Sequence, residues 1–491
     1  MFLTTAGLVR NWAQVQPTAP AIVLGRTGQT LSYRDLDRCS EKLAWTLSRQ
    51  GIQFGDTVAY LLEGPVKVLA LVVALSKLGA AWTPLNPASP AREWSRQYEH
   101  VGAVAIVSDL PVSRAILGRS PWISWDHVIA DAMPGDRFPQ SLSIFQTAGI
   151  LYTSGTTGIP KGVRHTYKTL WGWNHSLITT VGIHRDDRVA NPYPLFHMGG
   201  IGFALATLQA GATVILDTPF DPDDLSDSII RHGATILLLT PTMAQSLVDL
   251  APTPRQDLRY SRLRHLVTTS APLSTITHQA MQDAWPNLPM SQLYSATEAI
   301  FSMARPINPG PSLCVGYPVF GSQLTILDDQ GVPLGINIHG TVYVRGLSVL
   351  AGYHRSLDQF HAWHDDWVTC FDVGYRDAEG DLHLVDRAKD IINSGGEKIA
   401  SWEIENVLRS HPGIKEVAVV GQSDQYWGEK VHAVVVAKDP SLTEDQVRGF
   451  ARQHLPSFKV PKTVVFMDAL PKTITGKILK RELRQESDAQ E

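Results

Sequence analysis

The chain has 491 residues, a formal net charge of −4, 44% hydrophobic residues and 18% charged residues. Its length exceeds what one compact core needs, and its composition excludes a disordered chain, so we expect a globular protein of two or more domains. The sequence has no long basic run and gives no electrostatic support for nucleic-acid binding. Three widely separated cysteines, Cys39, Cys314 and Cys370, indicate neither a disulfide framework nor a zinc ribbon.

The first residues lack the apolar region of a signal peptide, because Thr4 and Thr5 interrupt it and Arg10 follows soon after. The longest apolar run, residues 68–75, ends at Ser76. It is too short to cross a bilayer and predicts a buried helix. We therefore expect a cytoplasmic monomer or homodimer with no membrane span and no nucleic-acid partner.

Strand and helix patterns alternate through the first two thirds of the chain. A capping box from Ser32 to Asp35 and an apolar face from Leu36 to Leu47 predict a helix that ends before Gly51. This alternation predicts an α/β fold with two βαβ-type subdomains, each a parallel sheet covered by helices. Further helices are predicted at 68–78 and 221–232, and buried strands at 21–24, 58–62, 103–107, 149–152, 212–216, 235–240 and 264–268.

The character of the sequence changes after about residue 315, where Gly and Pro become frequent. Short strands at 323–327, 340–345 and 381–385 predict a small antiparallel, barrel-like subdomain. Beyond the charged run 386–390, helices at 401–410 and 443–454 and strands at 417–420 and 431–436 predict a compact α+β domain. We expect a large N-terminal domain over residues 1–386, a hinge at 387–390 and a small, mobile C-terminal domain over 391–491.

The most informative stretch runs from Tyr152 to Val163, at the carboxyl end of a predicted strand, where open α/β sheets bind ligands. Its hydroxyls and small-residue N–H groups can wrap a polyphosphate, and Lys161 adds a mobile positive charge. The spacing is not that of a Walker A loop, and a polar surface turn is the ordinary alternative. Its six consecutive Thr, Ser and Gly residues are Thr153, Ser154, Gly155, Thr156, Thr157 and Gly158.

This loop resembles the phosphate-binding signature of the adenylate-forming superfamily, which includes acyl-CoA synthetases, peptide-synthetase adenylation domains and firefly luciferase. A second segment, from Tyr294 to Glu298, is similar to the superfamily's Tyr-Gly-x-Thr-Glu motif. The resemblance implies that Tyr294 packs on adenine, that Thr297 contacts the α-phosphate, and that Glu298 holds Mg²⁺ together with Thr153. Taken alone, the segment would equally fit a helix start with Glu298 in solvent.

Other segments resemble the walls of the substrate sites. Ser295, which stands where Gly is usual, and Ala296 are implied to border the acyl pocket. His197, in Pro-Leu-Phe-His, is similar to the residue that lines the carboxylate site. Amino-acid-activating relatives typically carry Asp there, so His predicts a plain acid without an α-amino group. The resemblance gives the adenine wall to Ser270, Ala271 and Pro272.

Asp372 occupies the position of a superfamily carboxylate that accepts hydrogen bonds from both ribose hydroxyls. The residues before it depart from the Arg-Thr-Gly-Asp pattern, and Phe371 replaces Gly. We therefore expect a displaced backbone and looser ribose binding there. Nearby, His361, His364 and Asp365 are metal-ligating residue types, but a Trp-rich setting without a fourth ligand predicts an exposed loop.

Residues 385–392 match the superfamily hinge. The resemblance implies that Arg387 contacts ribose and phosphate, that Lys389 is the pivot, and that Lys477, near the C-terminus, bridges the substrate carboxylate and the α-phosphate. A glycine-rich loop is implied to swing in and line the pantetheine tunnel for coenzyme A; its residues are Ser394, Gly395 and Gly396.

Together these motifs cover residues 152–481 and imply an AMP-forming acid–thiol ligase. A fatty or aryl acid would be activated with MgATP to acyl-AMP and pyrophosphate, and the acyl group would pass to coenzyme A. Three alternatives stay open: an acyl carrier protein as acceptor, a luciferase-like oxygenase, and a non-catalytic sensor of nucleotides or acyl groups. The intact Lys161, Glu298 and Lys477 argue against the sensor.

Overall fold

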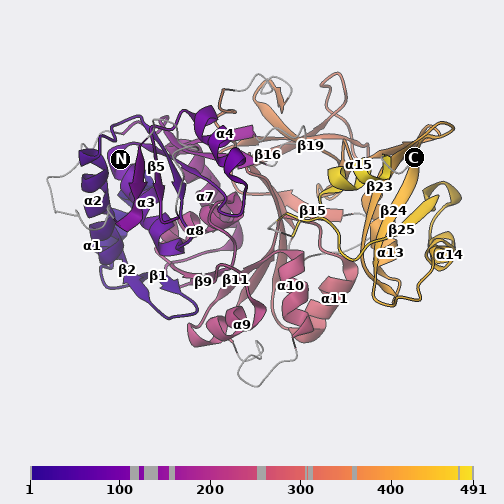
Figure 1. Cartoon of the computed structure of the whole chain (residues 1–491), viewed down its shortest axis with the longest axis horizontal. Coiled ribbons are helices and arrows are strands. Elements are labelled where there is room, and N and C mark those ends of the chain that lie inside the picture. The colour runs from indigo at the N-terminus through magenta and orange to yellow at the C-terminus, as the bar shows by residue number, and fades with distance from the viewer. Residues whose placement is uncertain are drawn as a thin grey trace.

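The structure is a computed structural model that describes residues 3–110, 121–126, 142–153, 161–250, 261–304, 307, 313–355, 362–473 and 476–488. Three sheets organise these residues, and the C-terminal part of the chain lies at one side of the larger body (Figure 1). Within the described residues, no helix is both long and apolar enough to cross a membrane. The predicted phosphate loop from Ser154 to Gly158, and His361, lie outside the described residues.

The first sheet has six strands in the order β6-β5-β3-β4-β7-β8. The pairings among β6, β5, β3, β4 and β7 are parallel, whereas β8 returns antiparallel to β7. The strands are β3 (Thr57–Leu61), β4 (Ala81–Pro84), β5 (Ala105–Ser108), β6 (Trp122–Ser124), β7 (Thr147–Thr153) and β8 (Lys161–Thr166). The associated helices are α1 (Thr5–Val15), α2 (Tyr33–Arg49), α3 (Pro65–Leu78), α4 (Ala91–Val101) and α7 (Tyr167–Val181).

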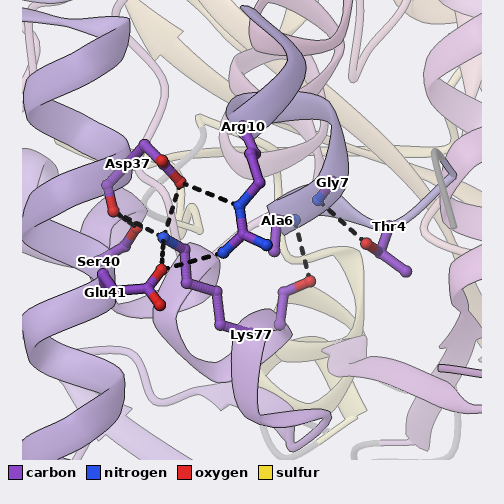
Figure 2. Close-up of polar contacts among 9 residues, drawn as sticks. Thr4, Ala6, Gly7, Arg10, Asp37, Ser40, Glu41 and Lys77 are labelled. Atoms are coloured by element: carbon purple, nitrogen blue, oxygen red, sulfur yellow. Dashed lines mark hydrogen bonds and ion pairs between the residues drawn. The ribbon is translucent and has the colours of Figure 1, made fainter. Parts of the chain in front are cut away.

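Helix α3 is apolar on every side, and its residues from Val68 to Leu78 are buried, which confirms the helix predicted from the apolar run. One charge lies inside it. Lys77, whose side chain is 1% exposed, places Nζ 2.7 Å from Asp37 and 2.7 Å from Glu41, both on α2. Arg10 of α1 lies 3.0 Å from the same Glu41 (Figure 2). The ion cluster therefore ties three helices together.

The second sheet begins as a parallel sheet with the neighbours β13-β12-β11-β9-β10-β1, and β2 closes this edge antiparallel to β1. Its strands are β1 (Pro20–Leu24), β2 (Thr30–Ser32), β9 (Arg188–Asn191), β10 (Thr213–Leu216), β11 (Ile236–Leu239), β12 (His265–Thr268) and β13 (Met290–Ser295). The helices are α8 (Met198–Ala210), α9 (Pro222–Arg231), α10 (Pro241–Asp249) and α11 (Thr275–Ala284). Side-chain caps fix three of these helix starts, as Asp221, Thr240 and Ser274 each accept a backbone N–H three residues on.

The antiparallel subdomain predicted after residue 315 is present, but it continues the parallel sheet through β14 and β15. The order is β16-β17-β19-β20-β15-β14-β13, and β18 pairs with β19. The strands are β14 (Ile300–Ala304), β15 (Leu313–Pro318), β16 (Ser322–Leu327), β17 (Gly340–Gly346), β18 (Trp363–His364), β19 (Trp367–Arg376) and β20 (Leu382–Arg387). Ser322, at the start of β16, donates its hydroxyl to Ile300 O of β14 at 3.2 Å, so the strands curl back in a barrel-like way.

The third sheet has five strands, with β22-β21-β24-β23 in order and β25 parallel to β24. Its own buried aliphatic cluster includes Ile392, Leu408, Val419 and Val435. The described elements are β21 (Ile392–Ser394), β22 (Glu397–Ile399), α13 (Ser401–Arg409), β23 (Ile414–Asp424), β24 (Gly428–Ala437), α14 (Glu444–His454), a 3-10 turn (Ser457–Lys459), β25 (Thr463–Phe466) and α15 (Lys480–Asp488). The residues 387–390 expected to form the hinge lead from β20 to this sheet.

Candidate functional site

The two ends of the predicted phosphate loop and the Tyr294 segment lie at the ends of strands in the two large sheets. Thr153 ends β7, and Lys161 opens β8 directly opposite it, so the two flanks of the predicted phosphate loop are paired with each other. In the second sheet, Ser270 follows β12 and Ser295 ends β13, and these two strands are parallel neighbours. The carboxyl ends of parallel strands lie at one edge of a sheet, so the adenine-wall and Tyr294 segments share an edge.

Tyr294, Asp372 and Arg387 come together from three strands. The Tyr294 hydroxyl donates a hydrogen bond to the Asp372 carboxylate, and Arg387 Nε lies 3.3 Å from the other carboxylate oxygen. Asp372 and Arg387 face each other across the β19–β20 pairing. Burial and the neighbouring Asp372 raise the pKa of Tyr294, so this phenol keeps its proton. The arrangement offers an aromatic ring, a carboxylate and a guanidinium within one small region.

Phe371 does not move Asp372 out of this pairing. Its backbone has φ +64°, a left-handed conformation that glycine adopts without strain and a bulky residue adopts rarely. The pairing with β17 shifts register here, since Tyr343 faces Thr369 while Thr341 faces Val373. Phe371 lies inside this irregularity, while Asp372 stays paired with Arg387 on β20. Looser ribose binding at Asp372 stays a prediction.

Glu298 is buried and accepts a hydrogen bond from the Tyr353 hydroxyl at 3.0 Å. Burial raises the pKa of Glu298, while a hydrogen bond from its own backbone N–H, the Tyr353 hydrogen bond and Arg387 oppose that rise. The interpretation of this segment as a helix start with Glu298 in solvent is wrong, because Tyr294 and Ser295 complete β13 and the carboxylate lies inside the protein. Lys161 Nζ lies 5.6 Å from the ring centre of Tyr353, so the phosphate-loop lysine approaches the same tyrosine.

His165, from β8, contacts the backbone of Thr297, the residue before Glu298. Its Nε2 lies 2.9 Å from Thr297 O, and burial lowers the pKa of His165 to about 4. The imidazole is therefore neutral near pH 7, and Nε2 donates to the carbonyl. No motif pointed to His165 or Tyr353, because each acts through a contact with a residue more than 50 positions away.

On the acyl side, His197 is the residue that precedes α8. Burial lowers its pKa to about 4, so it is neutral near pH 7. Its Nε2 is buried and has no hydrogen-bond partner among the described residues. The Ser295 hydroxyl, at the predicted acyl pocket, lies 3.3 Å from the Thr269 hydroxyl. Ser270, at the predicted adenine wall with Ala271 and Pro272, takes a left-handed φ of +78°.

Lys477 follows β25 in the chain and lies within electrostatic reach of Asp372 and Arg387. Desolvation lowers its pKa to about 8, as does the nearby positive charge of Arg387, while the Asp372 carboxylate opposes this shift. The side chain is nevertheless still exposed to water. Gly476, directly before it, has φ +82°, and a Cβ there would come within 2.8 Å of the Thr242 hydroxyl on α10. A glycine therefore lets the loop carrying Lys477 approach the large domain closely.

The glycine-rich loop lies at the edge of the third sheet. Gly395 and Gly396 are exposed and have φ of +60° and +88°, whereas Ser394 is buried. Gly395 N donates to Trp427 O at 2.8 Å, and a Cβ on Gly395 would come within 2.8 Å of the Trp427 ring. Sequence reasoning did not single out Trp427, because nothing in the sequence relates it to a loop 30 residues earlier.

Of the remaining predicted positions, Ala296 is half-buried and the others are exposed. Lys389 is exposed and burial of part of its side chain lowers its pKa. Beside it, Asp390 pairs with Arg484 of α15 at 3.1 Å. His364 and Asp365 lie exposed at the tight turn between β18 and β19. Within the part of the chain that the structure describes, no group of three or more His, Cys, Asp or Glu side chains could hold a metal.

Comparison with known proteins shows the family. Residues 9–354 match the AMP-binding enzyme family, and residues 403–477 match the C-terminal domain of AMP-binding enzymes. The chain belongs to the AMP-binding enzymes. The resemblance to the adenylate-forming superfamily is thereby confirmed, and the protein is an acyl-CoA synthetase-like enzyme.

Its relatives include CoA ligases of aromatic acids. A 2-succinylbenzoate–CoA ligase of Geobacillus kaustophilus is 30% identical over 487 residues, 97% of each chain. A 4-coumarate–CoA ligase of Oryza sativa subsp. japonica is 30% identical over 499 residues, 94% of this chain and 90% of the relative. Among solved structures, o-succinylbenzoate CoA synthetase from Bacillus subtilis with its acyl-adenylate intermediate gives a TM-score of 0.89 at 28% identity, covering 97% of each chain. The same enzyme with ATP and a magnesium ion gives 0.87 at 27% identity, covering 97% of this chain and 98% of that chain.

Proposed function

We propose that this AMP-binding enzyme converts a carboxylic acid, ATP and coenzyme A into acyl-CoA, AMP and pyrophosphate, with an aryl acid as its natural substrate. In the first step a carboxylate oxygen attacks the α-phosphorus, and the bond to the β-phosphate oxygen breaks. In the second step the thiol of coenzyme A loses its proton and attacks the acyl carbon, and AMP leaves. The observation that carries the proposal is the cluster of Tyr294, Asp372 and Arg387, together with the close approach of the Lys477 loop to α10 at Gly476.

The nucleotide is assigned to residues that the fold brings together. Tyr294 packs on adenine beside Ser270, Ala271 and Pro272, Asp372 and Arg387 hold the ribose, and the phosphates lie by Lys161 and the loop that Thr153 begins. Thr297 contacts the α-phosphate. Positioning and charge stabilisation supply the catalysis, and no protein nucleophile takes part. We assign Lys477 to the point where the incoming carboxylate and the α-phosphate would otherwise repel each other, so that its charge would act most strongly in the transition state.

Magnesium fits the residues present. Glu298 supplies a carboxylate and Thr153 a hydroxyl, and hard oxygen ligands of this kind suit Mg²⁺. Burial raises the pKa of Glu298, so a cation would compensate a charge that the protein otherwise holds at a cost. When bound, Mg²⁺ would neutralise phosphate charge; the protein's own part is to hold Glu298 through Tyr353.

The acid is assigned to the region of His197, Ser295 and Ala296. A neutral histidine cannot pair with an ammonium group as an aspartate would, so an α-amino acid is disfavoured. The relatives that act on 2-succinylbenzoate and 4-coumarate support an aromatic acid over a fatty acid. For the second step we propose that the small domain turns about Lys389 and brings Ser394, Gly395 and Gly396 to the pantetheine arm.

A pyrophosphate-release screen tests the proposal. Purified protein is incubated with MgATP and short, medium, long and aromatic acids, including 2-succinylbenzoate and 4-coumarate, with and without coenzyme A, and acyl-CoA is measured by mass spectrometry. We expect an aromatic acid to give the highest kcat/KM and coenzyme A to give the thioester. Preferential release with amino acids, or transfer only to a pantetheinylated carrier protein, would contradict the substrate or the acceptor respectively. Lys477→Ala is the matched inactive control.

A further inference from the structure

Helix α13 begins with its first N–H bonded to a carboxylate from another sheet. The residue before the helix, Ala400, has no capping side chain. Instead, Asp386 of β20 accepts the Ser401 N–H at 2.7 Å and the Ser401 hydroxyl at 2.5 Å. A helix start normally finds its cap in the preceding residue. Here the cap comes from the last strand before the expected hinge, so it joins the two sides of that hinge.

The Ser401 hydroxyl also accepts a hydrogen bond from a lysine. Lys480, at the start of α15, donates to the Ser401 hydroxyl at 2.5 Å and lies 2.7 Å from Glu405, one turn further along α13. The serine hydroxyl gives its one proton to Asp386 and accepts from Lys480, so its bonding capacity is used in both directions. Ser401 is fully buried, and Glu405 is nearly so. The three side chains form a continuous polar chain, which we name the Asp386–Ser401–Lys480 clasp.

Each end of the clasp lies close in sequence to a residue of the candidate site. Asp386 precedes Arg387, which pairs with Asp372. Lys480 follows Lys477 by three residues, and the intervening turn is short. The helix start itself rests on the large domain, because Trp402 packs against the buried cluster that Tyr294 and Phe371 also contact. The position of α13 is therefore set by contacts on both sides of residues 387–390.

We propose that Lys480 is a positioning residue for Lys477, acting through Ser401 and Asp386, and that the clasp belongs to the adenylate-forming step alone. This inference rests on the proposed function. Turning about Lys389 would separate Asp386 from Ser401, so the clasp would open before the thioester step. Lys480 itself touches neither nucleotide nor acid; it fixes the end of the segment that carries Lys477.

The half-reactions separate this role from a general structural one. We expect Lys480→Met to lower kcat for pyrophosphate release by about 10- to 100-fold, because a displacement near 1 Å costs about that much. Its KM for ATP should change little, and thioester formation from supplied acyl-AMP and coenzyme A should stay near the wild-type rate. Ser401→Ala breaks the hydrogen bonds of the clasp with a smaller change in side-chain size. It is the alternative test variant if Lys480→Met does not fold. The matched control is Lys459→Met, since Lys459 pairs with Glu403 on the same helix at 2.5 Å and lies outside the clasp.

Two further measurements test whether Lys480 acts through Lys477. In a Lys477→Ala background, Lys480→Met should cause no additional loss, because a positioning residue has nothing left to position. Hydrogen–deuterium exchange of the peptide around residue 477 should be faster in Lys480→Met and Ser401→Ala than in Lys459→Met. Additive losses, equal losses in both half-reactions, or unchanged exchange would overturn the clasp. A wild type that releases no pyrophosphate with any acid would instead overturn the proposed function, and the exchange measurement would still decide on the clasp.

Discussion

Tyr353 donates its hydroxyl proton to Glu298 at 3.0 Å, although 55 residues separate them in the chain. Glu298 is the residue to which we assign magnesium, and Tyr353 also lies beneath Lys161. The phenol holds the carboxylate in place, and together with the residue's own backbone N–H it opposes the rise in the pKa of Glu298 that burial causes. Tyr353, which lies outside every recognised motif, thus orients the carboxylate to which we assign magnesium.

Glu298→Ala should lower pyrophosphate release at limiting Mg²⁺ by about 10²-fold, because several kcal/mol of charge stabilisation are lost. Tyr353→Phe keeps the carboxylate but removes the hydrogen bond, so its loss should be smaller, about 2- to 10-fold. Raising the Mg²⁺ concentration should restore Tyr353→Phe more fully than Glu298→Ala. Wild-type magnesium dependence in Glu298→Ala would refute the assignment.

At position 371, glycine should give a more stable protein than alanine, which is the reverse of the usual order. At φ +64° alanine is strained, as any L-residue is. The free energy of unfolding of Phe371→Gly should therefore be about 1 kcal/mol larger than that of Phe371→Ala. Urea denaturation of both variants measures this difference. At Val373, on the same strand, the order should be the ordinary one, with glycine less stable than alanine. Equal stabilities at position 371 would show that the left-handed conformation costs nothing there.

Replacement of Lys77 should lower the free energy of unfolding and leave the rate of pyrophosphate release unchanged. In Lys77→Met, the cation left to Asp37 and Glu41 among the described residues is Arg10, which lies 3.0 Å from Glu41 and is 32% exposed (Figure 2). Mostly buried carboxylates that lose their buried cation are costly, so we expect a loss of about 2–3 kcal/mol in free energy of unfolding. Arg10→Met, which removes the more exposed cation, should cost less than about 1 kcal/mol. Similar losses in the two variants would contradict the ranking by burial.

Asp217 should make stability fall as pH rises through the acid range. Burial raises its pKa from 3.8 to about 6, despite a hydrogen bond from Ser228 at 2.9 Å. Between these two values the folded state holds more protons than the unfolded state, so the free energy of unfolding decreases with rising pH. Asp217→Asn removes this dependence. It should gain about 1–3 kcal/mol relative to wild type between pH 4 and pH 7.5, as chemical denaturation at both pH values would show. Asp249→Asn, at an exposed position, should show no such gain.

Lys477→Ala should abolish one half-reaction selectively. Removing the cation between two anions should slow pyrophosphate release by about 10²- to 10³-fold. Thioester formation from supplied acyl-AMP should be nearly unaffected, because the small domain would then have carried Lys477 away. Lys161→Ala should impair both steps, since Lys161 stays with the large domain. Comparable loss of both half-reactions in Lys477→Ala would argue for a static site, provided circular dichroism shows an intact fold.

Local patterns predicted the elements well where the pattern itself reflects burial. The capping box of Ser32 and Asp35 opens α2, and the apolar run at 68–75 lies within α3. The alternating strands after residue 315 are also present. Their continuity with the parallel sheet was not predictable, because β14 and β15 join the two parts through pairings between strands that no local signal relates.

In the candidate site too, some residues could be predicted from local motifs and others could not. Short motifs pointed to Tyr294, Glu298, Asp372 and Lys477, and their roles stay predictions. Tyr353, His165 and the Asp386–Ser401–Lys480 clasp could not be found from the sequence, because each depends on a contact made only after folding. The left-handed backbone of Phe371 was likewise hidden, since the sequence showed that Phe371 replaces a glycine but not that it would adopt a left-handed conformation.

The continuity of the large sheet bears on how products leave. Tyr294 and Asp372 lie on β13 and β19, which one unbroken series of hydrogen-bonded neighbours connects through β14, β15 and β20. The two ends of a bound nucleoside would therefore be held by a single framework that cannot part without breaking strand pairings. Release of AMP would therefore depend on movement of parts outside this framework, and our proposal gives that movement to the small domain.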